Sequence, residues 1–69
     1  MNDFINAIKK PIFQKDIILT LFDKLTKTQK EKIITFFGDS KKWEDLDNFG
    51  KALFIRRNAF SLSSILKDS

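Results

Sequence analysis

The sequence predicts an all-α fold, in which four to five short helices form a compact bundle or an orthogonal array. Two observations lead to this class. Apolar residues recur at spacings of three and four rather than two, which is the period of a helix and not of a strand. The strongest helix breakers are also sparse, since the chain has one Pro and two Gly. Residues 1–69 are expected to form a single small helical domain.

A chain this short needs a dense core, because domains of about 60 residues bury only about 60% of the surface that the unfolded chain exposes. The chain has no cysteine and no histidine, which excludes disulfides and the usual zinc sites. It has instead eight Phe and one Trp, and aromatic side chains dominate the energetics of small cores. Because so many large apolar groups can exceed what one core covers, a homodimer is a second expectation.

The first two predicted helices are separated by Pro11. The first extends through Lys9 and is capped by Asn2 or Asp3. Its apolar face consists of Phe4, Ile5 and Ile8. The second, about 11–25, starts at Pro11, whose missing N–H is not needed in a first turn. Its apolar residues cover more than half of its circumference, which is typical of a central helix: Ile12, Phe13, Ile17, Ile18, Leu19, Leu21, Phe22 and Leu25.

The third predicted helix follows the segment TKTQKE and ends at Phe37. This segment contains two overlapping capping boxes, Thr26 with Gln29 and Thr28 with Glu31. Gly38 comes directly after the last apolar residue, where glycine commonly adopts the left-handed conformation that stops a helix.

The fourth predicted helix, about 41–57, begins after Asp39 or Ser40. At 100° per residue, one face collects Trp43, Leu46, Gly50, Leu53 and Phe54. Since a mid-helix glycine costs roughly 1 kcal/mol, Gly50 indicates either a kink or the close approach of another helix. A break near Asn58 then leads to a short last helix, capped by Ser61, that buries Leu62, Ile65 and Leu66.

The break near Asn58 bears on Arg56 and Arg57, the only two arginines of the chain. Both lie in the last turn of the fourth predicted helix, where positive charge complements the helix dipole. Arginine also suits interfaces and anionic ligands, because its planar guanidinium donates a fork of hydrogen bonds. The sequence leaves both interpretations open.

Catalysis is not expected, because the chain has no His, Cys or Tyr from which the usual nucleophile–base pairs are built. The acidic residues Asp39, Glu44, Asp45 and Asp47 do not converge on a helix, and no Gly-rich phosphate loop is present. No cofactor or metal is predicted. No run of about 18 apolar residues exists, so we expect no membrane span, and the N-terminal segment shows no signal-peptide pattern. The absence of cysteine fits the cytoplasm.

The leading hypothesis is a small regulatory or adaptor protein that binds a partner protein through surplus apolar surface and arginine. Aromatic residues and arginine are enriched at interface cores. The predicted contact residues are Arg56, Arg57 and Phe60, together with Phe4, Ile5 and Ile8 on an exposed side of the first helix.

The alternative hypothesis is a small DNA-binding regulator, because residues 1–42 carry nine lysines against five acids. The lysine patch would comprise Lys24, Lys27, Lys30, Lys32, Lys41 and Lys42. A partial helix-turn-helix match also exists over residues 51–67, with Arg56 where the turn glycine is normally found. Its recognition helix would turn Ser61, Ser63, Ser64 and Lys67 toward the groove of DNA.

Overall fold

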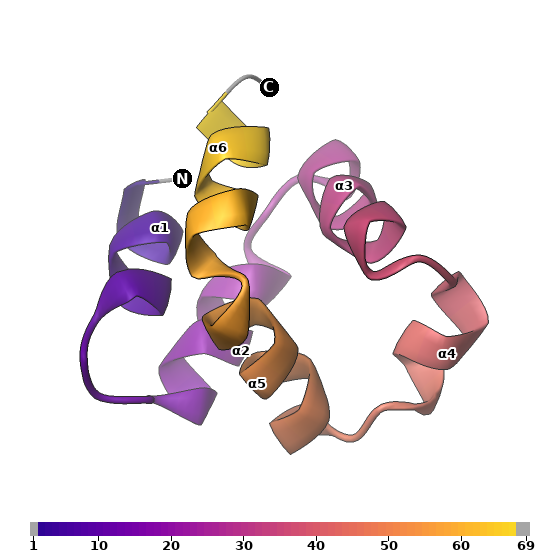
Figure 1. The fold of residues 1–69 in the computed structure, drawn as a ribbon, viewed down its shortest axis with the longest axis horizontal. Helices are drawn as coiled ribbons and strands as arrows, with labels where there is room; N and C mark the ends of the chain where they lie inside the picture. The colour runs from indigo at the N-terminus through magenta and orange to yellow at the C-terminus, as the bar shows by residue number, and fades with distance from the viewer. Residues whose placement is uncertain (1, 68–69) are drawn as a thin grey trace.

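The computed structural model describes residues 2–67, and it confirms the all-α class (Figure 1). Six helices rather than four or five occur in this part of the chain, and no strand is present there. The helices are α1 (Asn2–Lys9), α2 (Lys15–Asp23), α3 (Lys27–Phe37), α4 (Ser40–Asp45), α5 (Asn48–Arg57) and α6 (Ala59–Lys67). None of these six helices is long and apolar enough to cross a membrane.

The second helix starts four residues later than predicted. Pro11 and Ile12 lie in the connection between α1 and α2, and Gln14 is the N-cap of α2. The longer connection lets the chain reverse, so that α1 packs along both α2 and α6. Asp3 lies in the first turn of α1 instead of preceding it, and the predicted cap at the side chain of Asn2 falls outside what the structure describes.

The third helix begins at the first of its two predicted capping boxes, Thr26 with Gln29, whereas Thr28 lies inside the helix and does not cap it. The Thr26 hydroxyl accepts a hydrogen bond from the Gln29 N–H at 3.2 Å, and the Gln29 side chain accepts one from the Thr26 N–H at 2.9 Å. Both bonds satisfy N–H groups that have no partner within the helix. Gly38 ends α3 with a φ of 122°, a conformation that residues with a Cβ rarely adopt.

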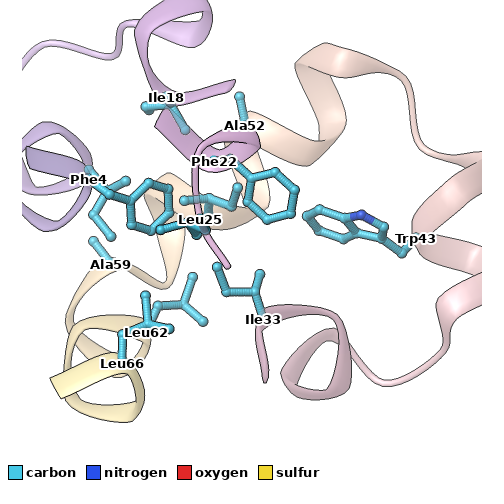
Figure 2. Packing of buried hydrophobic residues seen from close by; sticks show 12 residues of the cluster. Phe4, Ile18, Phe22, Leu25, Ile33, Trp43, Ala52, Ala59, Leu62 and Leu66 are labelled. Carbon is cyan, nitrogen blue, oxygen red and sulfur yellow. The ribbon is translucent and has the colours of Figure 1, made fainter. Parts of the chain in front are cut away.

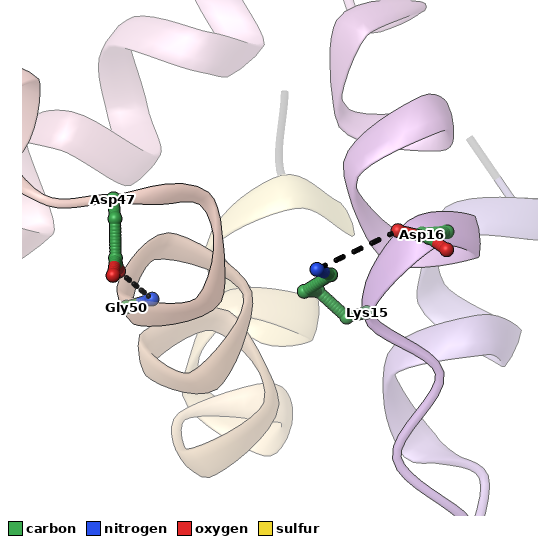
Figure 3. A network of polar contacts seen from close by, with 4 residues as sticks. All are labelled: Lys15, Asp16, Asp47 and Gly50. Atoms are coloured by element: carbon green, nitrogen blue, oxygen red, sulfur yellow. Dashed lines mark hydrogen bonds and ion pairs between the residues drawn. The ribbon is translucent and has the colours of Figure 1, made fainter.

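The fourth predicted helix is wrong in one respect, because it is two helices. Asp39 caps α4, as expected, but the chain then becomes extended at Leu46. Asp47 starts α5, and its carboxylate accepts a hydrogen bond from the Gly50 N–H at 2.7 Å (Figure 3). Gly50 therefore lies in the first turn of α5, so neither a mid-helix kink nor the close approach of another helix is needed to explain it.

The break near Asn58 is confirmed. The backbone N–H of Asn58 and its side-chain amide both donate to the carbonyl of Phe54, at 3.1 and 2.9 Å. These bonds close α5, and α6 starts at the next residue. The predicted cap at Ser61 is therefore wrong, since Ser61 lies inside α6.

The core joins all six helices (Figure 2). Trp43 is the only buried residue of α4, and it links that helix to the rest of the protein. Its ring centroid lies 5.7 Å from that of Phe22, 5.6 Å from that of Phe37 and 5.9 Å from that of Phe54. Aromatic pairs at such separations contribute about 0.5–1.5 kcal/mol beyond their buried area. By contrast, the one ion pair within residues 3–67, Lys15 with Asp16, is solvent-exposed and stabilises the fold little.

Candidate functional site

Two large apolar side chains remain mostly in water near the C-terminal end of α1. Phe60, in the first turn of α6, is 77% exposed, and Ile12, in the connection between α1 and α2, is 73% exposed. We call the surface formed by Lys9, Pro11, Ile12, Arg56 and Phe60 the Phe60 face. Isolated apolar residues on a surface are ordinary, whereas a group of them marks a candidate contact site.

Arg56 holds this surface together from α5. Its guanidinium donates one hydrogen bond to the carbonyl of Ile8 and another to the carbonyl of Pro11, both at 3.3 Å. The Ile8 carbonyl is in the last turn of α1, where carbonyl groups lack helical partners. Arg56 therefore complements the C-terminus of α1, not only that of its own helix, and positions the connection that carries Ile12.

A cation also lies over the exposed ring of Phe60. The ammonium of Lys9 is 5.4 Å from the Phe60 ring centroid, within the range of a cation–π contact. Such a contact at an exposed site is worth about 0.5–1 kcal/mol. It leaves Phe60 accessible and brings α1 and α6 together at this surface.

An aromatic pair involves Phe13, the residue that follows Ile12. The rings of Phe13 and Phe49 meet edge to face, with centroids 5.7 Å apart. Phe49, in the first turn of α5, is 53% exposed. The pair links the connection between α1 and α2 to the N-terminal end of α5.

The two chain segments that build the Phe60 face carry charge of one sign. Residues 4–13 contain Lys9 and Lys10, residues 55–62 contain Arg56 and Arg57, and neither segment contains Asp or Glu. Of these four cations, Lys9 and Arg56 belong to the Phe60 face, so the charge on the face itself is positive.

The predicted contribution of the first helix to this surface is wrong. Phe4 and Ile5 are 2% and 6% exposed, and Ile8 is fully buried against the rest of the core. Helices α2, α5 and α6 all pack on α1 and cover its apolar face. These side chains support the surface from beneath and are not available to a partner.

The structure separates the two arginines. Arg57 is exposed and lines a groove of about 370 Å³ between the C-terminal end of α3, the end of α4 and α5. Its side chain makes no hydrogen bond or ion pair within the described part of the chain. The groove is also lined by Phe37, Leu46, Gly50, Leu53, Phe54 and Asn58.

The predicted lysine patch divides into two groups. Lys24 and Lys27 lie before and at the start of α3, and Lys41 and Lys42 follow its end. A helix of this length spans about 16 Å, so the groups are at opposite ends of it. Between them, Lys30 lies over the Phe22 ring at 5.9 Å, and Lys32 is half-buried beside Phe36.

The predicted recognition helix is wrong at Ser63. This side chain is 2% exposed, and its hydroxyl donates to the carbonyl of Ala59 at 2.7 Å. It therefore cannot turn toward the groove of DNA. Ser64 and Lys67 are exposed on α6, as that hypothesis requires.

Sequence reasoning missed Ile12, Lys9 and Pro11 as members of the surface. The pattern placed Ile12 in the apolar stripe of a central helix, because a helix starting at Pro11 continues the spacing. The available signal was the segment KKPIF, in which two lysines and a proline favour an exposed connection over a first helical turn.

The described residues contain no group of three acidic side chains placed to hold a metal ion. No protein-family model matches the chain, and comparison with curated proteins and with solved structures also gives no match. The candidate function therefore depends on the geometry of the surface alone.

Proposed function

We propose that this chain is a non-enzymatic regulatory or adaptor domain that acts by binding a partner protein through the Phe60 face. The observation that carries the proposal is the exposure of Phe60, beneath the Lys9 ammonium, and of Ile12, next to the Pro11 carbonyl that Arg56 binds. Fully burying a Phe or Ile side chain contributes about 1.5–3 kcal/mol, so a partner that covers both gains substantial binding free energy.

The hydrogen bonds of Arg56 favour an interface of defined shape. They tie the connection between α1 and α2 to α5, so less conformational entropy is lost when a partner packs on Ile12. Phe60 is placed on a helix and needs no rearrangement to be covered. A few anchors of this kind carry most of the free energy of a typical interface.

The charge of the surface indicates the chemistry of the partner. Lys9 and Arg56 favour an apolar patch that is bordered by Asp or Glu, because complementary charge speeds encounter and selects the partner. A homodimer through the same face would bring these cations together. The predicted homodimer therefore requires a different surface.

The test is affinity capture from host lysate with the immobilised chain, with and without nuclease, followed by binding measurements on the purified partner. We expect Phe60→Ser to weaken binding by about tenfold or more, since loss of one anchor removes at least about 1.4 kcal/mol. Ile17→Ser is the matched control, because Ile17 is also an exposed apolar residue of a helix but lies on α2. Equal weakening by both variants contradicts the proposal.

The same experiment tests the alternative of DNA binding. Binding to DNA releases counterions and therefore falls steeply as salt rises, whereas binding through an apolar anchor does not. A partner that disappears with nuclease treatment, and an affinity unaffected by Phe60→Ser, would support the alternative over the protein partner.

A further inference from the structure

The groove beside Arg57 has the size of a small-ligand site. Its volume, about 370 Å³, lies in the usual range of about 300–1,000 Å³ for such sites. The rings of Phe37 and Phe54 meet edge to face in its wall, with centroids 5.0 Å apart. Leu46 and Leu53 complete an apolar surface that a small hydrophobic group can cover.

One end of the groove offers hydrogen-bond donors. Among the described residues, Arg57 is the only charged residue that lines it, and no Asp or Glu does so. The guanidinium makes no hydrogen bond or ion pair among residues 2–67, so its donors are free for a ligand. The neighbouring Asn58 amide donates one hydrogen to the Phe54 carbonyl and has a second that this bond does not use.

We propose that this groove binds a small apolar monocarboxylate, with the apolar group against Phe37 and Phe54 and the carboxylate on Arg57. A planar guanidinium matches a carboxylate with two parallel hydrogen bonds, which a neutral ligand cannot replace. Helix α5 ends at Arg57 and α6 begins at Ala59, so the partial negative charge of one helix end and the partial positive charge of the other offset one another there. The charge of Arg57 therefore dominates the end of the groove.

This site is independent of the Phe60 face. Arg57 takes no part in the contacts that Arg56 makes with Ile8 and Pro11. Either proposal can therefore fail without affecting the other.

Trp43 provides a built-in reporter for the test. It is the only tryptophan of the chain, and its ring lies 5.6 and 5.9 Å from the two Phe rings in the wall of the groove. The full chain would be titrated with 3-phenylpropionate, with 3-phenylpropionamide as the neutral match and acetate as the ligand without an apolar group. We expect a saturable change in Trp43 fluorescence with the phenyl carboxylate, at least about twofold weaker binding of the amide, and no response to acetate.

A pair of variants tests the role of the arginine. Arg57→Gln should lower the affinity for 3-phenylpropionate about two- to fivefold, which is the range of an exposed ion pair. The affinity for the amide should stay unchanged. Lys67→Gln, which removes an exposed charge from the last turn of α6, should change neither affinity. Far-UV circular dichroism confirms that both variants are folded.

Three results would overturn the proposal. The first is the absence of a saturable response to 3-phenylpropionate, and the second is equal affinity for acid and amide. The third is binding of the peptide acetyl-Gly-Gly-Phe, with a free C-terminal carboxylate, that is tighter than binding of 3-phenylpropionate. This result would assign the groove to the C-terminus of a protein instead of a small molecule.

Discussion

Arg56 and Arg57 are adjacent in the sequence, yet the structure predicts that replacing them has different consequences for the stability of the fold. Arg56 donates to two backbone carbonyls of a distant segment, whereas Arg57 has no such contact within the described residues. Replacement by Met keeps an unbranched apolar stem in both cases and removes only the guanidinium. We expect Arg56→Met to destabilise the fold and Arg57→Met to have little effect.

The magnitude for Arg56 follows from its two hydrogen bonds. Both bonds are 3.3 Å long and the side chain is only partly buried, so each is worth about 0.5–1 kcal/mol. The expected loss is about 1–2 kcal/mol, which corresponds to a melting temperature about 4–16 °C lower for a domain of this size. For the exposed Arg57, the expected change is within about 0.5 kcal/mol.

The assay is urea unfolding of both variants, followed by the fluorescence of Trp43, which is buried in the core. The slope of the free energy with urea concentration should stay unchanged, because the surface exposed on unfolding is the same. Arg56→Lys is an informative third variant, since a single ammonium nitrogen lacks the two-pronged geometry with which Nη1 and Nη2 reach separate carbonyls, and it should recover only part of the loss. Equal stabilities for the two Met variants would refute the assigned role of Arg56.

Three further predictions concern the elements that build the core and the helix ends. Gly38→Ala should lower the free energy of unfolding by about 1–2 kcal/mol, because a φ of 122° strains any residue with a Cβ, although nothing lies within 4 Å of the added atom. A melting temperature no lower than that of the unchanged chain would contradict this. Asp47→Ala should cost about 1 kcal/mol by removing the cap of α5, whereas Asp47→Asn should retain most of the stability in the same urea assay. Ile33→Ala should cost about 2–5 kcal/mol, since Ile33 is fully buried, and a calorimetric loss below 1 kcal/mol would show that the site is not part of the packed core.

The elements whose signals are local can be predicted from the sequence alone. The capping box of Thr26 and Gln29, the stop at Gly38 and the start at Asp39 all depend on bonds within about four residues. Asn58 was also located correctly as a break. Such signals can be read without knowing what the helix packs against, because the groups that satisfy each other are neighbours in the chain.

The start of α2 and the division of the fourth predicted helix depend instead on packing between distant parts of the chain. The apolar spacing from Trp43 to Phe54 is compatible with one continuous helix. The division at Leu46 and Asp47 lets the Trp43 ring pack against Phe22 and Phe37, which come from other helices. A continuous pattern cannot reveal such a break, because its benefit comes from distant partners.

The candidate site depended on long-range packing to an even greater extent. The sequence indicated Phe60 and Arg56, but the partners of Arg56 lie 48 and 45 residues away. The apolar face of α1 looked equally suited to a partner protein and to the core of its own chain. Periodicity shows that a helix face must be covered, whereas the arrangement of the other helices determines what covers it.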